Sequence, residues 1–519
     1  MQFLSLMTKK GKVYLVGAGP GDESLITVKG LECLKTADVI VYDYLVNEEL
    51  LKHCKAGAEK IYVGKKASEH TLSQRGINEL LIEKAKQGFI VARLKGGDPF
   101  IFGRGSEEAM ELKNNDIEYE IIPGITAGIA APSYAGIPIT HRGYASSIAF
   151  ITGHEDPSKM KSDINWDKIA TGIGTLVFYM GVTNLPLIVS KLKEFGRKSN
   201  TPVALIRWGT RNFQQTITGS LDTIVKIAEE NNFQPPAIIV VGEVVGLRDK
   251  LRWFDIKPLF GKRIVVTRSR MQASGLCKSL KNLGADVIEF PAIDILPVKN
   301  FGLLDENINN LGTFSWIVFT SVNGVEIFFK RLFELNYDSR ILKSCKIAVI
   351  GAETGNALKQ FGIIPDLVPA TYTSEGIVEA FRLMKDKTKG KKILLPCSAL
   401  ARDIIPSELE KLGAIVKIVP IYENVIPEYS EEKINSYFEQ EFALVTFTSS
   451  STVMNLIEIF RKYKKEHLIG KIKGASIGPV TTETAKQNGI NIVTEAKIQT
   501  IEGLMDAVLE YFVNKKNES

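Results

Sequence analysis

The chain has 519 residues, which exceeds what one hydrophobic core normally supports, so we expect several domains. Hydrophobic residues make up 45% and charged residues 24% of the sequence, a composition that excludes a mainly disordered or fibrous protein. The formal net charge of +6 is spread along the chain and forms no Lys/Arg block, so the sequence predicts no nucleic-acid partner.

The five cysteines are odd in number and form no CxxC pair. This pattern argues against a disulfide framework and against a zinc site, and it is typical of a reducing compartment. The N-terminal residues lack the ordered regions of a signal peptide, and no apolar run is long enough to span a membrane. We therefore expect a cytoplasmic protein that has no membrane partner and holds no metal.

The first half of the chain alternates apolar strands with helical segments. A strand at 13–16 precedes a glycine-rich turn, a helix over 24–36 and a second strand at 39–42. Such alternation predicts an α/β fold with mostly parallel sheets, and the proline-rich stretch 123–138 is expected to join two α/β lobes. Further apolar runs predict strands at 90–94, 147–151, 175–179 and 237–241.

The turn Gly17–Asp22 places three glycines between the first strand and the first helix. Glycine lets a backbone approach a ligand closely, so the turn fits a nucleotide-binding loop as well as a plain strand–helix connection. A dinucleotide loop would read G-x-G-x-x-G, whereas here the third glycine comes one residue early, directly after Pro20. Asp43, which follows the second strand, still leaves an NAD-dependent oxidoreductase open as an alternative.

A second glycine-rich loop, Gly96–Gly105, follows the strand at 90–94. It holds four glycines, an acid and a proline, a combination that predicts a rigid loop with exposed backbone groups. Asp98 in this loop is suited to accept hydrogen bonds from the hydroxyl or amine groups of a ligand. The two loops indicate a ligand site at the carboxyl ends of the strands.

The sequence changes character near residues 251–261, and we place a domain boundary there. Beyond it, motifs recur in pairs: Gly261–Val266 returns as Gly390–Leu395, and Phe319–Ser321 returns as Phe447–Ser449. The offset of about 128 residues is far longer than the period of a solenoid, about 20–50 residues. The second half is therefore expected to contain two similar α/β lobes.

From about residue 11 to 255, the chain resembles the uroporphyrinogen-III C-methyltransferases of the tetrapyrrole methylase family. The resemblance implies a two-lobed α/β fold with S-adenosylmethionine, the methyl donor, bound between the lobes. It rests on an ordered set of motifs: Val16–Asp22, Val41–Asp43, Val63–Lys66, Gly96–Gly105, Pro123–Ala127, Gly136–Gly143, Thr152–His154, Tyr179–Gly181 and Thr201–Ala204.

The resemblance also implies roles for single residues. It makes Asp43 the proton acceptor and Lys65 the proton donor. A plain surface cation and a partner for a substrate carboxylate are the alternatives for Lys65. Trp208 stands where the family often has an acidic or amide residue. The cofactor contacts implied by the resemblance are Pro20, Gly96, Gly97, Asp98, Ile101, Thr126, Ala127, Met180, Gly209 and Ala237.

The implied substrate of the first half carries many carboxylates. Cationic side chains bind carboxylates through charge-assisted hydrogen bonds. Arg93, Lys95, Arg104 and Arg142 are therefore candidates for substrate contacts.

From about residue 261 to 512, the chain resembles the uroporphyrinogen-III synthases. The resemblance implies a two-lobed α/β fold, with one lobe in 261–297 and 423–512 and the other in 298–422. The implied reaction needs no cofactor. The matching motifs are Arg263–Arg268, Phe319–Val325, Ile350–Thr354, Ile421–Glu423, Phe447–Ser451 and Ile477–Thr482.

Four hydroxyl side chains of the second half fall on positions that the synthase family places around its cleft. They are Thr354, Tyr422, Ser449 and Thr481. By this resemblance Tyr422, Thr354 and Thr481 are candidate catalytic residues. The alternative for Ser and Thr is a structural role in a turn or a helix cap.

The two resemblances imply consecutive reactions on small-molecule tetrapyrroles. The second half would close hydroxymethylbilane to uroporphyrinogen III with inversion of ring D, and the first half would methylate that product to precorrin-2. A homodimer through the methyltransferase half is compatible with the resemblance. A tetrapyrrole sensor in the second half and another tetrapyrrole as methyl acceptor are alternatives. A precorrin-2 dehydrogenase/chelatase module would need its own chain before Gly11.

Overall fold

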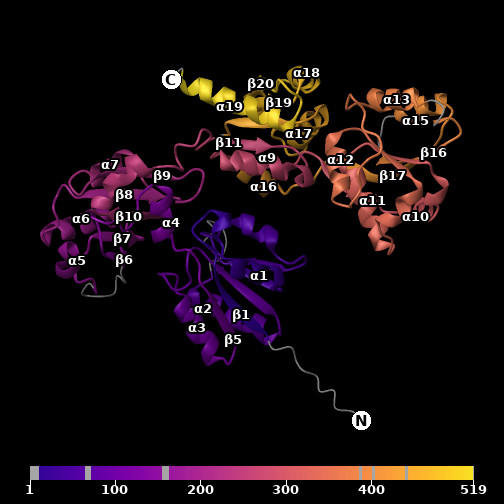
Figure 1. Ribbon diagram of the computed structural model, residues 1–519. Helices are drawn as coiled ribbons and strands as arrows, with labels where there is room; N and C mark the ends of the chain where they lie inside the picture. Colours follow the sequence, from indigo (N-terminus) through magenta and orange to yellow (C-terminus); the bar gives the residue numbers. More distant parts are fainter. Residues whose placement is uncertain are drawn as a thin grey trace, which may run out of the picture. The chain divides into compact units, whose positions relative to one another are not determined.

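The computed structural model describes residues 11–64, 72–154, 163–384, 388–399, 404–438 and 442–517. The chain forms two compact units, Met1–Arg263 with Ser279–Asp286, and Ile264–Lys278 with Val287–Ser519. Each half of the chain contributes two five-stranded sheets with flanking helices, which makes the fold α/β throughout (Figure 1). Within the described ranges, no helix combines the length and the apolar character that a membrane crossing requires.

The first sheet has the strand order β3-β2-β4-β1-β5 and is parallel throughout. Helices α2 and α3 cover the face that carries Val13, Val41 and Val91, and these residues form one buried apolar cluster with the two helices. Side chains alternate between the faces of a strand, so the odd-numbered residues of β4 all point toward α2 and α3. The elements are β1 (Lys12–Gly17), α1 (Val28–Thr36), β2 (Val39–Tyr42), β3 (Glu59–Tyr62), α2 (Gln74–Lys86), β4 (Ile90–Lys95), α3 (Gly105–Asn114) and β5 (Glu118–Ile122).

The second sheet, β6-β7-β10-β8-β9, is mixed rather than mostly parallel as expected. Only its β6–β7 pair is parallel; the β7–β10, β10–β8 and β8–β9 pairs are antiparallel. The short connection between β8 and β9 accounts for part of this difference, because a parallel pair needs a long crossover. The elements are α4 (Ala127–Tyr134), β6 (Ile148–Thr152), α5 (Trp166–Gly172), β7 (Thr175–Tyr179), α6 (Leu185–Glu194), β8 (Pro202–Arg207), β9 (Gln215–Ser220), α7 (Ile224–Glu230), β10 (Ala237–Val241) and α8 (Arg248–Leu251).

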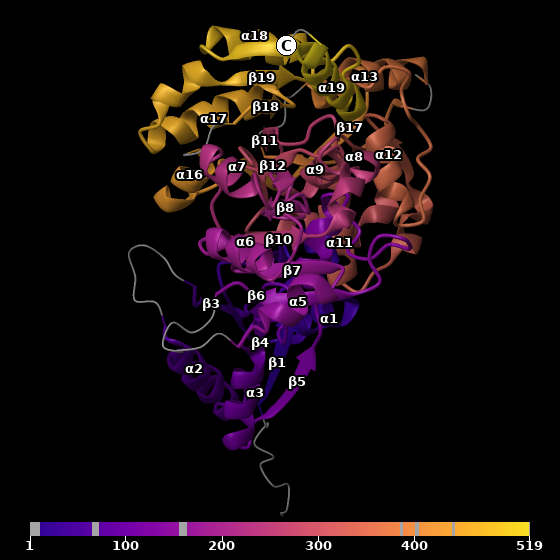
Figure 2. The same cartoon turned by 90° about the vertical axis from the view of Figure 1, so that its left-hand side faces the viewer.

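The second half contains the sheet β12-β11-β18-β19-β20, here called lobe one, and the sheet β13-β17-β16-β14-β15, here called lobe two. Figure 2 shows α17 and α18 beside β18 and β19 of lobe one. The elements of lobe one are β11 (Arg263–Val266), α9 (Arg270–Asn282), β12 (Asp286–Glu289), α16 (Glu431–Phe438), β18 (Leu444–Phe447), α17 (Ser450–Lys462), β19 (Lys473–Ser476), α18 (Pro479–Gln487), β20 (Asn491–Glu495) and α19 (Ile501–Asn517).

The chain passes between the two lobes a few residues from the expected positions. Strand β13 pairs antiparallel with β17, and Pro297 lies opposite Tyr422. Both strands therefore belong to lobe two, whose sheet runs from Asp294 to Val425 instead of lying within 298–422. The elements of lobe two are β13 (Asp294–Pro297), α10 (Gly302–Asn309), β14 (Trp316–Phe319), α11 (Val322–Glu334), β15 (Lys346–Val349), α12 (Ala352–Lys359), α13 (Ser374–Leu383), β16 (Lys392–Ser398), α15 (Ile404–Lys411) and β17 (Ile415–Val425).

Candidate active sites

The loops after β1 and β4 meet at the carboxyl end of the first sheet. Gly19 and Gly97 exchange two backbone hydrogen bonds, with N···O distances of 3.2 and 2.8 Å. The amide of Ala18 donates to the carbonyl oxygen of Lys95 at 2.8 Å. The two glycine-rich loops predicted from the sequence thus form one backbone surface.

Glycine is required where this surface meets the loop after β5. A Cβ atom on Gly124 would lie 2.3 Å from the carbonyl oxygen of Gly97, and one on Gly17 would lie 2.5 Å from the Cα atom of Gly124. Gly97 also has φ of +73°, a conformation that favours glycine. We call the backbone surface of Gly17, Gly19, Gly97 and Gly124 the glycine cradle.

Asp98 holds two of these loops together. Its Oδ2 accepts a hydrogen bond from the amide of Gly124 at 3.0 Å, and its Oδ1 accepts one from the amide of Phe100 at 2.8 Å. The Asp98 carboxylate, which was expected to bind a ligand, therefore also orders the loops of the glycine cradle. Each oxygen has two lone pairs and so keeps one acceptor position for a ligand.

The N-terminus of α4 faces the end of β7. Thr126, the residue before α4, has its Oγ1 2.7 Å from the hydroxyl oxygen of Tyr179, and the Gly128 amide donates to that oxygen at 2.8 Å. Burial raises the pKa of Tyr179, so its hydroxyl stays protonated at neutral pH. Met180 follows with φ of +54° and half of its side chain exposed. Thr126, Ala127 and Met180 therefore lie together where the two sheets of the first half meet.

The loop after β8 packs against the same region. A Cβ on Gly209 would lie 2.3 Å from the Cβ of Ala131 in α4, and Thr210 Oγ1 accepts a hydrogen bond from the Asp22 amide at 2.8 Å. The ring of Trp208 meets that of Tyr44 edge-on, with centroids 5.6 Å apart. The loop after β8 thus contacts both α4 and the turn after β1.

The structure brings most of the expected cofactor residues together. The cradle contains Gly97, and its loops carry Gly96, Asp98, Pro20 and the exposed Ile101. Ala237 begins β10 opposite Arg207, at the end of the second sheet where Trp208 and Gly209 follow. Lys65 lies outside the described residues.

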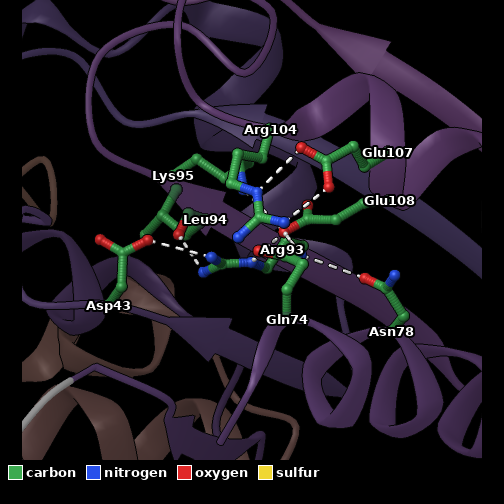
Figure 3. A network of polar contacts seen from close by, with 9 residues as sticks. All are labelled: Asp43, Gln74, Asn78, Arg93, Leu94, Lys95, Arg104, Glu107 and Glu108. Carbon is green, nitrogen blue, oxygen red and sulfur yellow. Dashed lines mark hydrogen bonds and ion pairs between the residues drawn. The ribbon is translucent and has the colours of Figure 1, made fainter. Parts of the chain in front are cut away.

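Asp43 follows β2 and contacts the neighbouring strand β4. Its Oδ2 accepts a hydrogen bond from Arg93 Nη2 at 3.0 Å (Figure 3). Its Oδ1 accepts one from the Leu45 amide at 3.2 Å. The Asp43 side chain is 26% exposed, whereas that of Arg93 is 4% exposed. Asp43 is therefore held by the protein and open to solvent at the same time.

The structure corrects the expectation that Arg93 and Lys95 contact substrate. Both side chains are buried and form ion pairs with Glu108 of α3, at 3.4 Å for Arg93 and 2.7 Å for Lys95. Burial, together with the charge of Arg93, lowers the pKa of Lys95. They point toward α2 and α3 because odd positions of β4 face that side of the sheet. Sequence reasoning missed Glu108, although two cations two residues apart in a buried strand signal a buried anion.

The other two candidate cations lie at the surface. Arg104 is exposed and forms an ion pair with Glu107, the residue three positions later, at 2.7 Å. Arg142 is exposed in the loop before β6. Both remain accessible to a ligand.

In lobe two, Tyr422 is buried in β17 and its hydroxyl lies 3.0 Å from Ser321 Oγ. Ser321 also accepts a hydrogen bond from the Gly324 amide at 3.0 Å and so caps α11. Burial raises the pKa of Tyr422, so its phenol stays protonated at neutral pH. The pair joins β17 to the carboxyl end of β14.

The other three candidate hydroxyls of the second half, those of Ser449, Thr354 and Thr481, cap a helix or are buried. Ser449 caps α17 by accepting a hydrogen bond from the Thr452 amide, the equivalent of the Ser321 cap in lobe two. Thr354 and Thr481 are the third residues of α12 and α18, and both are buried. Thr354 and Thr481 therefore occupy matching positions in the two lobes, and Ser449, the counterpart of Ser321, has a capping role.

Comparison with known proteins gives a match for each half. Residues 12–225 match the family model of tetrapyrrole (corrin/porphyrin) methylases, and residues 274–506 match that of the uroporphyrinogen-III synthase HemD. The chain is 38% identical over 501 residues to the porphyrin biosynthesis protein HemD of Ruminiclostridium josui, covering 96% of this chain and 98% of the relative.

Two further relatives match the first half alone. The chain is 57% identical over 235 residues to a uroporphyrinogen-III C-methyltransferase of Priestia megaterium, covering 45% of this chain and 98% of the relative. It is 52% identical over 241 residues to an S-adenosyl-L-methionine-dependent uroporphyrinogen III methyltransferase of Methanosarcina barkeri, covering 46% of this chain and 94% of the relative.

Proposed function

We propose that this chain, which belongs to the porphyrin biosynthesis proteins that join a tetrapyrrole methylase to a uroporphyrinogen-III synthase, catalyses two consecutive reactions. The second half closes hydroxymethylbilane to uroporphyrinogen III with inversion of ring D. The first half transfers methyl groups from S-adenosylmethionine to that product and yields precorrin-2. The observation that carries this function is the match of both halves in one relative over 96% of the chain.

The position of the glycine cradle at the carboxyl end of the first sheet supports S-adenosylmethionine binding there. A Cβ at Gly17 or Gly124 would collide with neighbouring backbone, so these glycines let the loops after β1, β4 and β5 pack closely at the carboxyl end of the sheet. Gly97, Asp98, Thr126, Ala127 and the exposed Met180 are the groups that we propose to hold the donor. When bound, it supplies an electrophilic methyl group on a sulfonium centre.

The protein then has two tasks, to align the acceptor carbon and to remove a proton from the ring. Alignment converts the encounter of two molecules into a reaction between fixed neighbours. We assign the proton to Asp43, because this carboxylate is partly exposed and its orientation is set by Arg93 and the Leu45 amide. Lys65, outside the described residues, remains the proposed donor.

The synthase half works without a cofactor. Its substrate loses a hydroxyl group readily, so holding it in a folded conformation supplies much of the catalysis. Tyr422 and the threonines Thr354 and Thr481 are the hydroxyls that we propose to take part. The protonated Tyr422 phenol can donate a hydrogen bond to a departing hydroxyl or to a substrate carboxylate.

Incubation of the full chain with hydroxymethylbilane tests this function. Without S-adenosylmethionine we expect the type III isomer, and with it we expect precorrin-2. Closure without the enzyme gives the type I isomer, so isomer analysis separates catalysis from background. Type I alone would contradict the synthase assignment, and unmethylated type III in the presence of the donor would contradict the methyltransferase assignment.

We also propose that the two enzymes occupy residues 11–255 and 261–512 and that the chain forms a homodimer through the methylase half. The full motif set of each enzyme within these ranges supports the boundary, and the resemblance to the methylases supports the dimer. Fragments expressed with these bounds should each catalyse their own step. Light scattering of the full chain and of the first fragment should give the mass of a dimer for both.

A further inference from the structure

The face of the first sheet beneath α2 and α3 changes from apolar to charged at its carboxyl end. Val91 in β4 belongs to the buried apolar cluster, but the next two residues on this face, Arg93 and Lys95, are cations. Their exposed fractions are 3% and 4%. Two cations thus replace apolar side chains in the interior, and one of them, Arg93, is hydrogen-bonded to the proposed proton acceptor Asp43.

Glu108 of α3 is the anion that balances these cations. Its side chain is fully buried, and Oε1 accepts hydrogen bonds from Lys95 Nζ at 2.7 Å, Gln74 Nε2 at 3.1 Å and Arg93 Nε at 3.4 Å. Its Oε2 has no hydrogen-bond partner among the described residues. These three side-chain hydrogen bonds therefore converge on one carboxylate oxygen (Figure 3).

Arg93 carries this arrangement to Asp43. Its guanidinium is planar, so an ion pair at Nε together with the bond from Nη1 to the Leu94 carbonyl, 3.0 Å, fixes where Nη2 points. Nη2 donates to Asp43 Oδ2 at 3.0 Å. The Asp43 side chain is 26% exposed, whereas the side chains of Arg93, Lys95 and Glu108 are at most 5% exposed.

Stability alone does not explain these buried charges. Ion pairs in an interior lose hydration, and apolar residues of similar size often stabilise a fold as well or better. We propose that Glu108 is a positioning residue for methyl transfer: it fixes Arg93, which in turn holds the Asp43 carboxylate in place. The proposal rests on the proposed role of Asp43 as proton acceptor.

A double-mutant cycle with Glu108→Gln and Asp43→Asn tests the proposal in the full chain. Glutamine keeps the shape of the side chain but removes the negative charge. Arg93 then has Asp43 as its remaining anionic partner and draws this carboxylate away from the substrate. We expect the turnover number for methylation of uroporphyrinogen III to fall about 10- to 100-fold, the range for the loss of charge-assisted hydrogen bonds.

The decisive comparison is the double variant. Because Glu108 acts through Asp43, Glu108→Gln should not slow the Asp43→Asn chain further. A purely structural role would instead slow both backgrounds by the same factor. Glu111→Gln, an exposed acid one turn along α3, is the matched control and should keep normal turnover.

Each failure has its own pattern. A parent chain that methylates nothing contradicts the proposed function. A fast Asp43→Asn chain overturns both the role of Asp43 and this inference. If Asp43→Asn is slow but Glu108→Gln has normal turnover, the inference alone is overturned. The same holds if the rate losses of the two single variants add in the double variant. If Glu108→Gln does not fold, the variant that combines Lys95→Met with Glu108→Gln is used, because it removes one buried charge of each sign. Normal turnover in that variant also overturns the positioning role of Glu108.

Discussion

The two halves of the chain place different chemistry at the carboxyl ends of their strands. In the first half, Asp43 is held by Arg93, and Arg93 by the buried Glu108. In lobe two of the second half, Ser321 follows β14 and its hydroxyl is bonded to that of Tyr422 in β17. The difference matches the reactions: proton removal needs an oriented base, whereas ring closure of a reactive chain needs many donors that hold a shape.

This comparison makes loss of Asp43 the most damaging single change. Asp43→Asn should lower the turnover number for methylation of supplied uroporphyrinogen III by about 10²–10⁴-fold, the usual cost of losing a general base. The affinity for S-adenosylmethionine, measured by calorimetry, should not change, because Asp43 lies outside the glycine cradle. Asp116→Asn, an exposed acid in the turn before β5, is the control. Normal turnover in Asp43→Asn would break the contrast between the halves.

Loss of Asp98 should affect binding more than chemistry. Asp98→Ala removes both hydrogen bonds that order the cradle, to Phe100 and Gly124. We expect the Kd for S-adenosylmethionine to rise about 10- to 100-fold, since each such bond to a charged group contributes roughly 1.5–3 kcal/mol and loops relax in part. Asp98→Asn should weaken binding less, because the amide oxygen still accepts one bond. An unchanged Kd in both variants would show that the loops hold without Asp98.

The sequence predicted the two glycine-rich loops of the first half because their signals are local. Glycines at Gly17–Gly21 and Gly96–Gly105 mark close backbone approaches, and the structure pairs Gly19 with Gly97. Glu108 could not be assigned in the same way. Its partners Arg93 and Lys95 come from another element, and only the packing of α3 on β4 shows that all three are buried.

The fold shows the same division between local and long-range information. The duplicated motifs predicted two lobes in the second half, and the structure has two sheets there. The crossing points were displaced because β17 continues past Tyr422 to pair with β13, a contact between residues more than a hundred positions apart. The mixed character of the second sheet was missed for the same reason, since strand direction depends on which strands become neighbours.

Removal of the Tyr422 hydroxyl should have a modest effect. Tyr422→Phe loses one hydrogen bond between neutral groups, with Ser321, and we expect the rate of uroporphyrinogen III formation to fall less than about tenfold. Tyr337→Phe, which loses the bond to Asn309 at the surface, serves as the control. A rate loss of several hundredfold would mean that the phenol assists departure of the substrate hydroxyl. Catalysis in the second half would then depend on one side chain, as we propose for Asp43 in the first half.

The smallest effect is expected at Ser449. Ser449→Ala removes the cap of α17 and should lower the free energy of unfolding by about 1 kcal/mol without changing the synthase rate. Ser321→Ala should cost more, because Ser321 caps α11 and also bonds Tyr422. Chemical denaturation and isomer-resolved rate measurements check both variants. A rate loss at Ser449 without a stability loss would make it a substrate contact instead of a cap.

The central claim is that one chain carries two separate sites that use different means to run consecutive reactions. The most direct test supplies hydroxymethylbilane and S-adenosylmethionine together to the full chain bearing Asp43→Asn and follows both tetrapyrrole products over time. We expect uroporphyrinogen III to form from hydroxymethylbilane at the rate of the unmodified chain and then to accumulate, because precorrin-2 forms slowly. Formation of precorrin-2 at the normal rate, or an equal loss in the rate of the type III isomer, would contradict the central claim.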